Sequence, residues 1–346
     1  MKTENIDTSD LFITEEGLKA GSKIAPKGSI LLLTRGSGLF NGIPIARVEK
    51  DVAFNQDIKC LDSYGEVENE FIFYWLLSQK DYLMAKVGVT GIGAGKFDLD
   101  FLQKLMIPIP SERERKSIVG FASSISEKIR CNAKVNDNLQ QQAMALYAEM
   151  FLNSSNNDVT SGTLSDIAVI TMGQSPSGSS YNEDGVGEVF YQGRAEFGFR
   201  FPKRRLFTTE PKRMAVAGDV LLSVRAPVGD LNMAYERCCI GRGLGAIHSK
   251  TGHSSFVLYT MFALRSQLNV FNGEGTVFGS INRDALNAIP IDVPLVTKID
   301  QFEAVAHPID KLIRTNYEEN CRLEAIRNSL LPKLMSGEID VSAIRL

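Results

Sequence analysis

The amino-acid sequence contains one long internal repeat. The segment KGSILLLTRGSG at residues 27–38 aligns with AGDVLLSVRAPVG at residues 217–229, which matches Gly28 to Gly218 and Arg35 to Arg225. Further along, FIFYWLLSQKDYL matches FVLYTMFALRSQL, and GIGAGKFDLDFLQKLMIPIP matches GTVFGSINRDALNAIPIDVP. Because each copy must bury its own apolar side chains, a repeat of this length predicts two domains of the same architecture.

A heptad pattern follows each copy of the repeat. Seam positions advance by alternating steps of four and three residues, first from Ile118 to Met150 and then from Phe302 to Leu334. Asparagine occupies the same two seam positions in both copies, at Asn132, Asn136, Asn316 and Asn320. A polar seam residue fixes the register and partner of a coiled coil at a cost in stability. We therefore expect the two helices to pack on each other, with a kink or a late start at Pro308 in the second.

The predicted fold class is α+β, with two similar domains separated by two long helices packed as an antiparallel coiled coil. The expected boundaries are 1–110 for the first domain, 111–155 for the central helix, 156–294 for the second domain and 295–346 for the C-terminal helix. A helix of about forty residues spans ~60 Å at ~1.5 Å per residue, so the domains would be held far apart.

Shorter elements follow from local patterns. Apolar runs predict strands at Ile30 to Leu33 and Val220 to Val224, and helices at 71–83 and 256–268. Linkers are expected at Leu152 to Gly162 and at the prolines that end each domain.

Composition excludes several classes of protein. The chain has 346 residues, of which 44% are apolar and 23% charged, as in globular proteins. The longest uncharged apolar run, Phe256 to Leu264, is shorter than the ~20 residues of a membrane span, and acidic residues near the start argue against a signal peptide. We expect a cytoplasmic protein. The five cysteines form no C-x-x-C pair, and His248 and His253 have no acidic neighbour in the sequence, so we expect reduced thiols, no metal and no cofactor.

Several segments resemble the specificity subunit of type I restriction-modification enzymes. They are GSILLLTRG with VAFNQDIKCL, LMIPIPSERERKSIVGFASSISEKIRCNAKVNDNL and LEAIRNSLLPKLMSGEID, and TLSDIAVITMGQSPSGSSYNEDG is similar to the opening of a target-recognition domain. The resemblance covers nearly the whole chain. It implies a non-catalytic subunit whose two target-recognition domains each read half of a bipartite DNA sequence. The partners that it implies are double-stranded DNA, two modification (methyltransferase) subunits that methylate adenine, and restriction (translocase and nuclease) subunits that cleave DNA in phage defence.

The first domain departs from this pattern. About sixty residues from Val159 precede Gly218, but only twenty-seven precede Gly28, so a segment equivalent to Thr163 to about Phe197 has no counterpart. A displaced start codon, a rearranged gene copy and a genuine short form all fit this difference.

Motifs for catalysis are not found in the sequence. It contains no Pro-Pro pair, which the (Asn/Asp)-Pro-Pro-aromatic loop of an amino-methyltransferase requires. The tripeptide Glu114-Arg115-Lys116 could suggest a nuclease, but it is more typical of a solvated helix start. The stretch GVTGIGAGKF fails as a nucleotide-binding loop, because Thr90 replaces its first glycine and Phe97 replaces the required Ser or Thr. In the second copy Ser280 replaces Lys96, and we expect Asp98 and Asn282 to cap short helices.

Basic residues are concentrated in the second domain. Residues 194–225 carry eight basic and three acidic side chains, a net charge of +5 in a chain of net charge −3. The predicted DNA-binding residues are Arg35, Asn55, Gln56, Lys96, Arg194, Arg200, Lys203, Arg204, Arg205, Arg225 and Arg242. Salt bridges within the domain are the alternative for Arg35 and Arg225. The alternative function is a coiled-coil protein–protein adaptor without DNA specificity.

Overall fold

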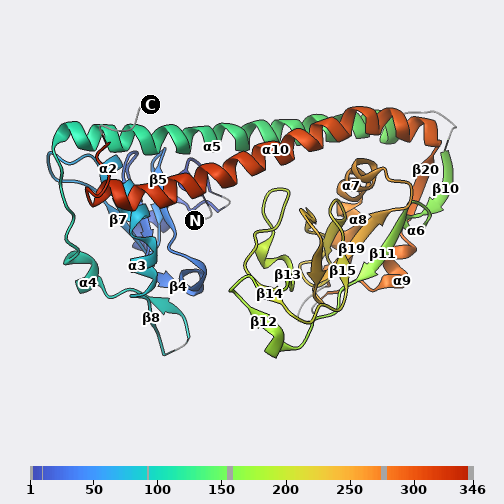
Figure 1. Ribbon diagram of the computed structural model, residues 1–346, viewed down its shortest axis with the longest axis horizontal. Helices are drawn as coiled ribbons and strands as arrows, with labels where there is room; N and C mark the ends of the chain where they lie inside the picture. The colour runs from blue at the N-terminus through green and yellow to red at the C-terminus, as the bar shows by residue number, and fades with distance from the viewer. Residues whose placement is uncertain (1–2, 10, 92, 154–158, 274–278, 342–346) are drawn as a thin grey trace. The chain divides into compact units, whose positions relative to one another are not determined.

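The structure, a computed structural model, describes residues 3–9, 11–91, 93–153, 159–273 and 279–341. The chain mixes helix and sheet and divides into two compact units (Figure 1). Unit 1 comprises Met1–Ala133 and Tyr317–Leu346, and unit 2 comprises Lys134–Asn316. The two long helices, α5 (Glu112–Tyr147) and α10 (Val296–Met335), contribute residues to both units. Across the described ranges, no helix combines the length and apolar character of a membrane span.

The central sheet of unit 1 has the strand order β1-β5-β3-β7. Its middle strand, β3 (Ile30–Leu33), is antiparallel to β5 (Ile45–Val48) on one side and to β7 (Ile58–Leu61) on the other. Strand β1 (Asn5–Ile6) adds to β5 in parallel. Strand β3 consists of Ile and Leu, and three of the four residues of β5 are apolar and buried, because both faces of these strands are largely covered.

Smaller elements complete unit 1. The β2 strand (Lys23–Ala25) pairs with β6 (Val52–Phe54), and β4 (Arg35–Gly36) and β8 (Gly88–Val89) both pair with β9 (Gly95–Lys96). The helices are α1 (Glu15–Gly21), η1 (Ser37–Asn41), α2 (Asn69–Ser78), α3 (Lys80–Met84) and α4 (Leu99–Gln103).

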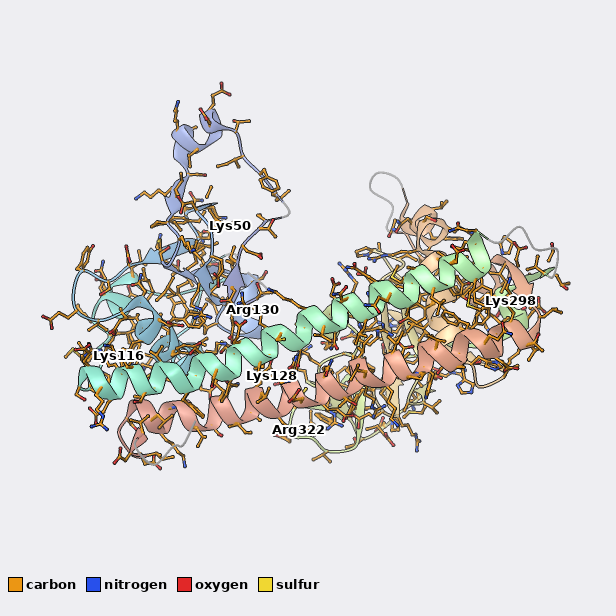
Figure 2. All side chains as sticks on the ribbon, turned by 90° about the horizontal axis from the view of Figure 1, so that it is seen from above. Lys50, Lys116, Lys128, Arg130, Lys298 and Arg322 are labelled. Atoms are coloured by element: carbon orange, nitrogen blue, oxygen red, sulfur yellow. The ribbon has the colours of Figure 1, made fainter. Side chains whose placement is uncertain are left out.

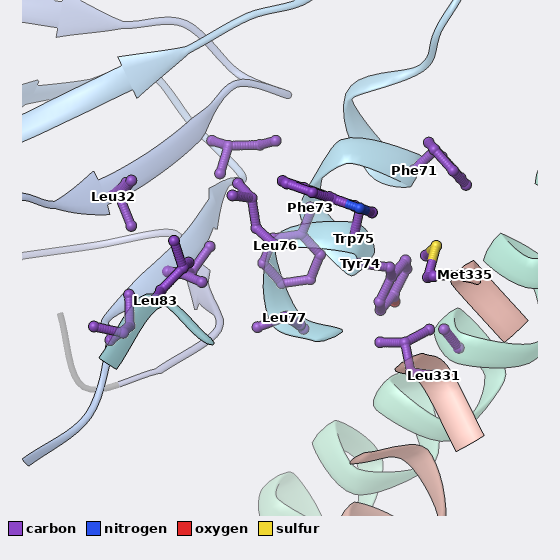
Figure 3. Packing of buried hydrophobic residues seen from close by; sticks show 14 of the residues in the cluster. Leu32, Phe71, Phe73, Tyr74, Trp75, Leu76, Leu77, Leu83, Leu331 and Met335 are labelled. Atoms are coloured by element: carbon purple, nitrogen blue, oxygen red, sulfur yellow. The ribbon is translucent and has the colours of Figure 1, made fainter. Parts of the chain in front are cut away.

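The core of unit 1 forms around α2. Phe71, Phe73 and Tyr74 on this helix are fully buried. They belong to one cluster with Leu32 of the sheet and with Leu331 and other residues of α10, and Figure 3 shows α2 between these two elements. This helix is apolar on nearly all sides because it is covered by the sheet on one side and the long helices on the other.

The central sheet of unit 2 has the order β11-β19-β16-β17. Its middle strand, β16 (Val220–Ser223), is antiparallel to β17 (Leu231–Met233) and to β19 (Leu244–Ser249). Strand β11 (Ala168–Met172) is antiparallel to β19 on its outer side.

Further elements surround this sheet. A five-stranded sheet has the order β12 (Tyr181–Asn182), β14 (Phe207–Thr208), β13 (Glu188–Tyr191), β18 (Cys238–Ile240) and β15 (Met214–Ala215). Strand β10 (Val159–Thr163) is antiparallel to β20 (Pro290–Pro294). The helices are η2 (Ala148–Leu152), α6 (Leu164–Ile167), η3 (Gly178–Ser180), η4 (Arg194–Glu196), α7 (Ser254–Ala263), α8 (Arg265–Asn269), η5 (Val270–Asn272) and α9 (Arg283–Asn287).

Equivalent hydrogen bonds link equivalent residues in the two units, as the sequence repeat predicts. After β3, Thr34 N donates to Asp57 O at 2.8 Å, and after β16, Val224 N donates to Gly243 O at 3.0 Å. The carbonyl of Thr34 accepts from Phe97 N at 2.9 Å, and that of Val224 accepts from Ile281 N at 3.1 Å. The internal alignment is therefore confirmed in space as well as in sequence.

The units differ where the sequence segment 163–197 has no counterpart. In unit 2 this segment supplies β11, which pairs with β19, and β13, which pairs with β18. In unit 1 the strands at the matching places are β7 and β6, and within the described part of that unit each pairs with a strand on one side only. The length difference thus corresponds to two strand edges that are covered in unit 2 and uncovered in unit 1.

The paired asparagines join α5 and α10 within each unit. In unit 1, Asn132 Nδ2 donates to Asn320 Oδ1 at 2.8 Å and to Glu319 at 2.7 Å. In unit 2, Asn316 Nδ2 donates to Asn136 Oδ1 at 2.8 Å, and Asn136 Nδ2 donates to the carbonyl of Ile313 at 3.3 Å. The earlier asparagine of α5 pairs with the later asparagine of α10, as expected for antiparallel helices. The ribbons of the two helices lie side by side in both views (Figures 1 and 2).

The outer surface of the long helices is charged. Lys116 and Lys128 of α5 and Arg322 of α10 are exposed, and Arg130 of α5 is partly exposed (Figure 2). Lys128 Nζ also lies 3.2 Å from Glu319 on the facing helix. The helices are thus amphipathic, with the apolar and asparagine-bearing positions turned inward.

Asn136→Ala should lower the free energy of unfolding by about 1–3 kcal/mol, because Asn136 is only 5% exposed and its loss leaves the amide of Asn316 unpaired. Urea unfolding followed by circular dichroism measures this. Replacing both residues by Leu should restore most of the stability, since no polar group is then left unpaired. Asn138→Ala, at an exposed site on the same helix, is the matched control; an equal loss there would contradict the explanation.

Several local predictions are confirmed. The strands at 30–33 and 220–223 form as expected. The side chain of Asp98 accepts from Asp100 N at the start of α4, and that of Asn282 accepts from Ala285 N at the start of α9. Each cap satisfies a backbone N–H that has no partner within its helix.

Other local predictions are wrong. The late start expected at Pro308 is wrong: helix α10 starts at Val296 and continues through Pro308, because packing along a 40-residue helix outweighs the loss of one hydrogen bond. It ends at Met335, and Gly337 follows with φ of 75°, the left-handed conformation common after helices. Of the expected linker, 154–158 lie outside the described residues and Val159–Gly162 belong to strand β10. The helices expected at 71–83 and 256–268 are each split in two, at Gln79 and Leu264.

Candidate nucleic-acid interface

An exposed arginine follows the central strand in each unit. Arg35 lies in β4, directly opposite Lys96 of β9. Arg225 forms an isolated antiparallel bridge with Ser280, the residue that matches Lys96 in the repeat. All four of these side chains are exposed. In both units, therefore, the arginine that follows the central strand lies opposite the matching residue of the repeat, which is Lys96 in unit 1 and Ser280 in unit 2.

A third position joins this pair. In unit 1 Gln56 occupies the turn between β6 and β7, and in unit 2 Arg242 occupies the turn between β18 and β19. The backbone hydrogen bonds of Thr34 and Val224 tie these turns to the end of the central strand. We call Arg35, Gln56 and Lys96 the unit 1 trio, and Arg225, Arg242 and Ser280 the unit 2 trio.

The unit 2 trio lines one surface cavity of about 580 Å³. Its walls include Met172, Val224 and Ile281, which supply apolar surface, and the cap residue Asn282. Two arginines and a hydroxyl in the lining of a partly apolar cavity suit an anionic ligand with an attached apolar group.

Close backbone contacts hold the turn that carries Arg242. Gly241 N donates to Tyr191 O at 2.8 Å, and Gly243 N donates to Gln192 O at 3.1 Å. The N–H of Arg242 donates to Ser175 Oγ at 3.2 Å. The approach is so close that a Cβ on Gly173 would lie 2.1 Å from Gly241 O. A Cβ on Gly241 or on Gly243 would likewise lie 2.8 Å from a backbone atom of Gln192, so only glycine fits on either side of Arg242.

A buried hydroxyl holds the turn that carries Arg225. The side chain of Ser223 is 2% exposed and donates from Oγ to the carbonyls of Arg225 and Pro227, at 3.0 and 2.8 Å. Neither Arg225 nor Arg242 has a carboxylate partner within the described ranges. Their charges are accordingly available to an external ligand.

Much of the basic segment at 194–225 is neutralised inside unit 2. Arg204 binds Glu236 at 2.7 Å, Arg205 binds Glu196 at 2.6 Å, and Arg194 pairs with Asp230. These three arginines are about half exposed. Lys203 is exposed and has no carboxylate partner among the residues described. The net charge of +5 read from the sequence therefore overstates the charge presented to a ligand.

Arg200 is the clearest correction among the predicted DNA-binding residues. Its side chain is 3% exposed, with Nη1 at 2.7 Å from Asp310 Oδ1 and Nη2 at 3.1 Å from Gln140. Tyr259 also donates to Asp310, at 2.9 Å, and burial raises the pKa of its hydroxyl. Arg200 thus belongs to an ion pair in the interior of unit 2 and is not available to DNA.

Comparisons with known proteins agree with this architecture. A family model described as "Type I restriction modification DNA specificity domain" matches residues 3–141. The putative type I restriction enzyme MjaX specificity subunit of Methanocaldococcus jannaschii is 28% identical over 296 residues, which cover 80% of this chain and 69% of that protein. The chain is thus similar to the specificity subunits of type I restriction-modification enzymes, and the family model covers its residues 3–141. The similarity to these non-catalytic DNA-recognition subunits supports a DNA-specificity role.

Two further proteins are similar to this chain. The EcoR124I/EcoR124II specificity subunit of Escherichia coli is 28% identical over 115 residues, 33% of this chain and 28% of that protein. The crystal structure of a type I restriction-modification S subunit from M. genitalium has a TM-score of 0.53 at 17% identity, covering 90% of this chain and 83% of that one. The latter similarity shows a shared fold.

Three further polar residues take part in local contacts. Asn55 Oδ1 accepts from Asp57 N at 3.1 Å and so shapes the turn that presents Gln56. Glu114 caps helix α5 by accepting from Ser111 N at 2.9 Å. In the nuclease-like tripeptide, Glu114 and Lys116 are exposed as a solvated helix start predicts, whereas Arg115 is buried and lies 3.2 Å from Glu68.

Two histidines and the cysteines also have clear environments in the structure. His248 lies 2.7 Å from Asp219 and His253 lies 2.8 Å from Asp300, so both have acidic partners that the sequence did not reveal. The described chain contains no group of three or more residues arranged to bind a metal. All five cysteines are free, and burial raises the pKa of Cys238 to about 12, which keeps that thiol protonated and unreactive.

Proposed function

We propose that this chain is a specificity subunit that reads a bipartite DNA target, with one half-site for each of two target-recognition domains separated by an α5–α10 coiled coil. The proposed boundaries are 1–110 and 156–294 for the domains, and 111–155 and 295–346 for the helical regions. The observation that carries the proposal is the repetition of one exposed polar arrangement, the unit 1 trio and the unit 2 trio, at the same place in both units.

The proposed DNA contacts fall into two groups. The first comprises the trio residues and Lys203, whose exposed side chains have no carboxylate partner in the described parts of the chain. The second comprises Arg194, Arg204 and Arg205, whose contribution is weaker because each already shares its charge with a carboxylate. Exposed cations at strand ends and turns are suited to contact the phosphates and base edges of a duplex.

The proposed partners are double-stranded DNA, two modification subunits and the restriction subunits. The paired asparagines Asn132–Asn320 and Asn136–Asn316 would fix the register of the coiled coil. A fixed register would hold the two recognition domains in a constant relation and so define the spacing between half-sites. Adenine methylation and DNA cleavage would be carried out by the partner subunits.

Mapping methylated bases in cells that express this chain with its neighbouring modification subunit tests the proposal. We expect methylated adenines within a motif of two short sequences separated by a spacer of constant length. Cells with the modification subunit alone are the control and should lack the motif. The absence of sequence-specific methylation would contradict the DNA-reading function and favour the adaptor, and a half-motif or palindromic motif would show that unit 1 does not read DNA.

A further inference from the structure

We infer that the two trios are equivalent phosphate-binding sites that hold the DNA backbone without reading bases. The inference rests on the proposed DNA-reading function and assigns a specific task to these positions within it. The ligand at each site is a phosphodiester group of the duplex.

The two trios carry the same number of positive charges, but the charges stand at different positions. The unit 1 trio has its cations at Arg35 and Lys96, with the uncharged Gln56 at the turn position. In unit 2 the turn position carries the cation, Arg242, and the loop position carries the uncharged Ser280. A base contact depends on which side chain stands at which position, whereas a phosphate contact depends chiefly on the number of nearby cations. Two cations and one neutral hydrogen-bonding group in either order fit a phosphate site.

Like charges face each other in unit 1. Arg35 and Lys96 stand directly opposite on adjacent antiparallel strands, an arrangement that destabilises a sheet. Neither has a carboxylate partner in the described parts of the unit. By contrast, Arg204 and Arg205 of unit 2 each have one. A cationic pair left without an acid is stabilised when an anion binds to both members.

The unit 2 trio is held by backbone contacts that do not depend on the ligand. Arg242 is fixed by the close approach of the glycines around it, and Arg225 by the buried hydroxyl of Ser223. Both arginines and Ser280 line the same cavity. Phosphate contacts set the position of a protein on the duplex, and this task requires cations on a rigid support.

The salt dependence of binding to a duplex of unrelated sequence tests the inference. Fluorescence anisotropy is measured between 50 and 200 mM salt with the full chain, assembled with its modification subunit. Arg225→Ala and Arg242→Ala should each reduce the slope of log affinity against log salt by ~0.9, the value for one phosphate contact. Lys311→Ala removes an exposed charge from α10 and should leave the slope unchanged. Equal slopes for the wild type and both arginine variants would overturn the inference.

A permuted variant separates charge from residue identity. Arg242→Gln combined with Ser280→Lys gives unit 2 the residue order of unit 1. We expect the wild-type salt slope, an affinity within about twofold of wild type, and an unchanged methylation motif, because the phosphate term depends on charge number. Arg242→Gln alone should lose ~0.9 in slope, which shows that Ser280→Lys provides the compensation. Thermal unfolding of each variant confirms that the fold is retained.

The outcomes distinguish this inference from the proposed function. A permuted variant that keeps the low slope of Arg242→Gln, or that changes one half of the methylation motif, would overturn the phosphate assignment while leaving the DNA-reading function in place. A wild-type complex that methylates without any sequence motif would contradict the proposed function, and the salt slopes would then report only non-specific contacts.

Discussion

Asp310→Asn is expected to lower the free energy of unfolding of unit 2 by about 3–5 kcal/mol. The substitution keeps the shape of the side chain but removes the negative charge that faces Arg200 at 2.7 Å. Because Arg200 is 3% exposed, its guanidinium would remain in the interior without a counter-ion. Urea unfolding monitored by circular dichroism measures the loss.

Two matched variants test the cause of this effect. Asp300→Asn alters a carboxylate of α10 that is 59% exposed and pairs only with His253 among the described residues, so a change within about 0.5 kcal/mol is expected. Arg200→Met with Asp310→Leu should recover most of the stability, because apolar residues of similar volume remove both buried charges together. If Asp310→Asn is no more harmful than Asp300→Asn, the buried pair does not stabilise unit 2.

Gly173→Ala should destabilise unit 2 by about 1–3 kcal/mol or more and weaken DNA binding at the same time. The new Cβ would lie 2.1 Å from Gly241 O and 2.8 Å from Ile240 O, both backbone atoms of the segment that leads to Arg242. Relief of the clash must displace the turn that presents this arginine. Thermal unfolding and the anisotropy assay measure the two effects.

Gly178→Ala is the control for that variant. A Cβ at Gly178 meets no atom within 4 Å, and the residue does not have a positive φ. Its stability and affinity should therefore match the wild type. Wild-type DNA binding by Gly173→Ala, despite lowered stability, would show that the position of Arg242 is unimportant for binding.

Local patterns predicted the repeated elements well. A helix cap depends only on residues within one turn of the helix start, so the capping roles of Asp98 and Asn282 were predicted correctly. The apolar strands β3 and β16 were also predicted correctly. Elements that depend on distant partners were less predictable. The segment Val159–Gly162 looked like a linker because its residues are small and polar, but it pairs with β20, more than a hundred residues away.

The role of each charged residue depended on its spatial neighbours. Arg200 and Arg204 look equivalent in the sequence, yet one lies in the interior with Asp310 and the other at the surface with Glu236. Neither acidic partner is close in sequence, so composition alone could not separate a structural arginine from a surface one. The same applies to His248 and His253, whose carboxylate partners are Asp219 and Asp300.

The sequence by itself determined that this protein is built from two similar units and two long helices, because internal similarity and heptad spacing are properties of residue order. Its resemblance to specificity subunits rested on the same order of segments. Only the tertiary structure decided which cations remain free, because an ion pair forms between side chains that folding brings together from distant positions. In the folded protein Arg225 and Arg242 line one cavity, whereas Arg200 is buried in the interior of unit 2.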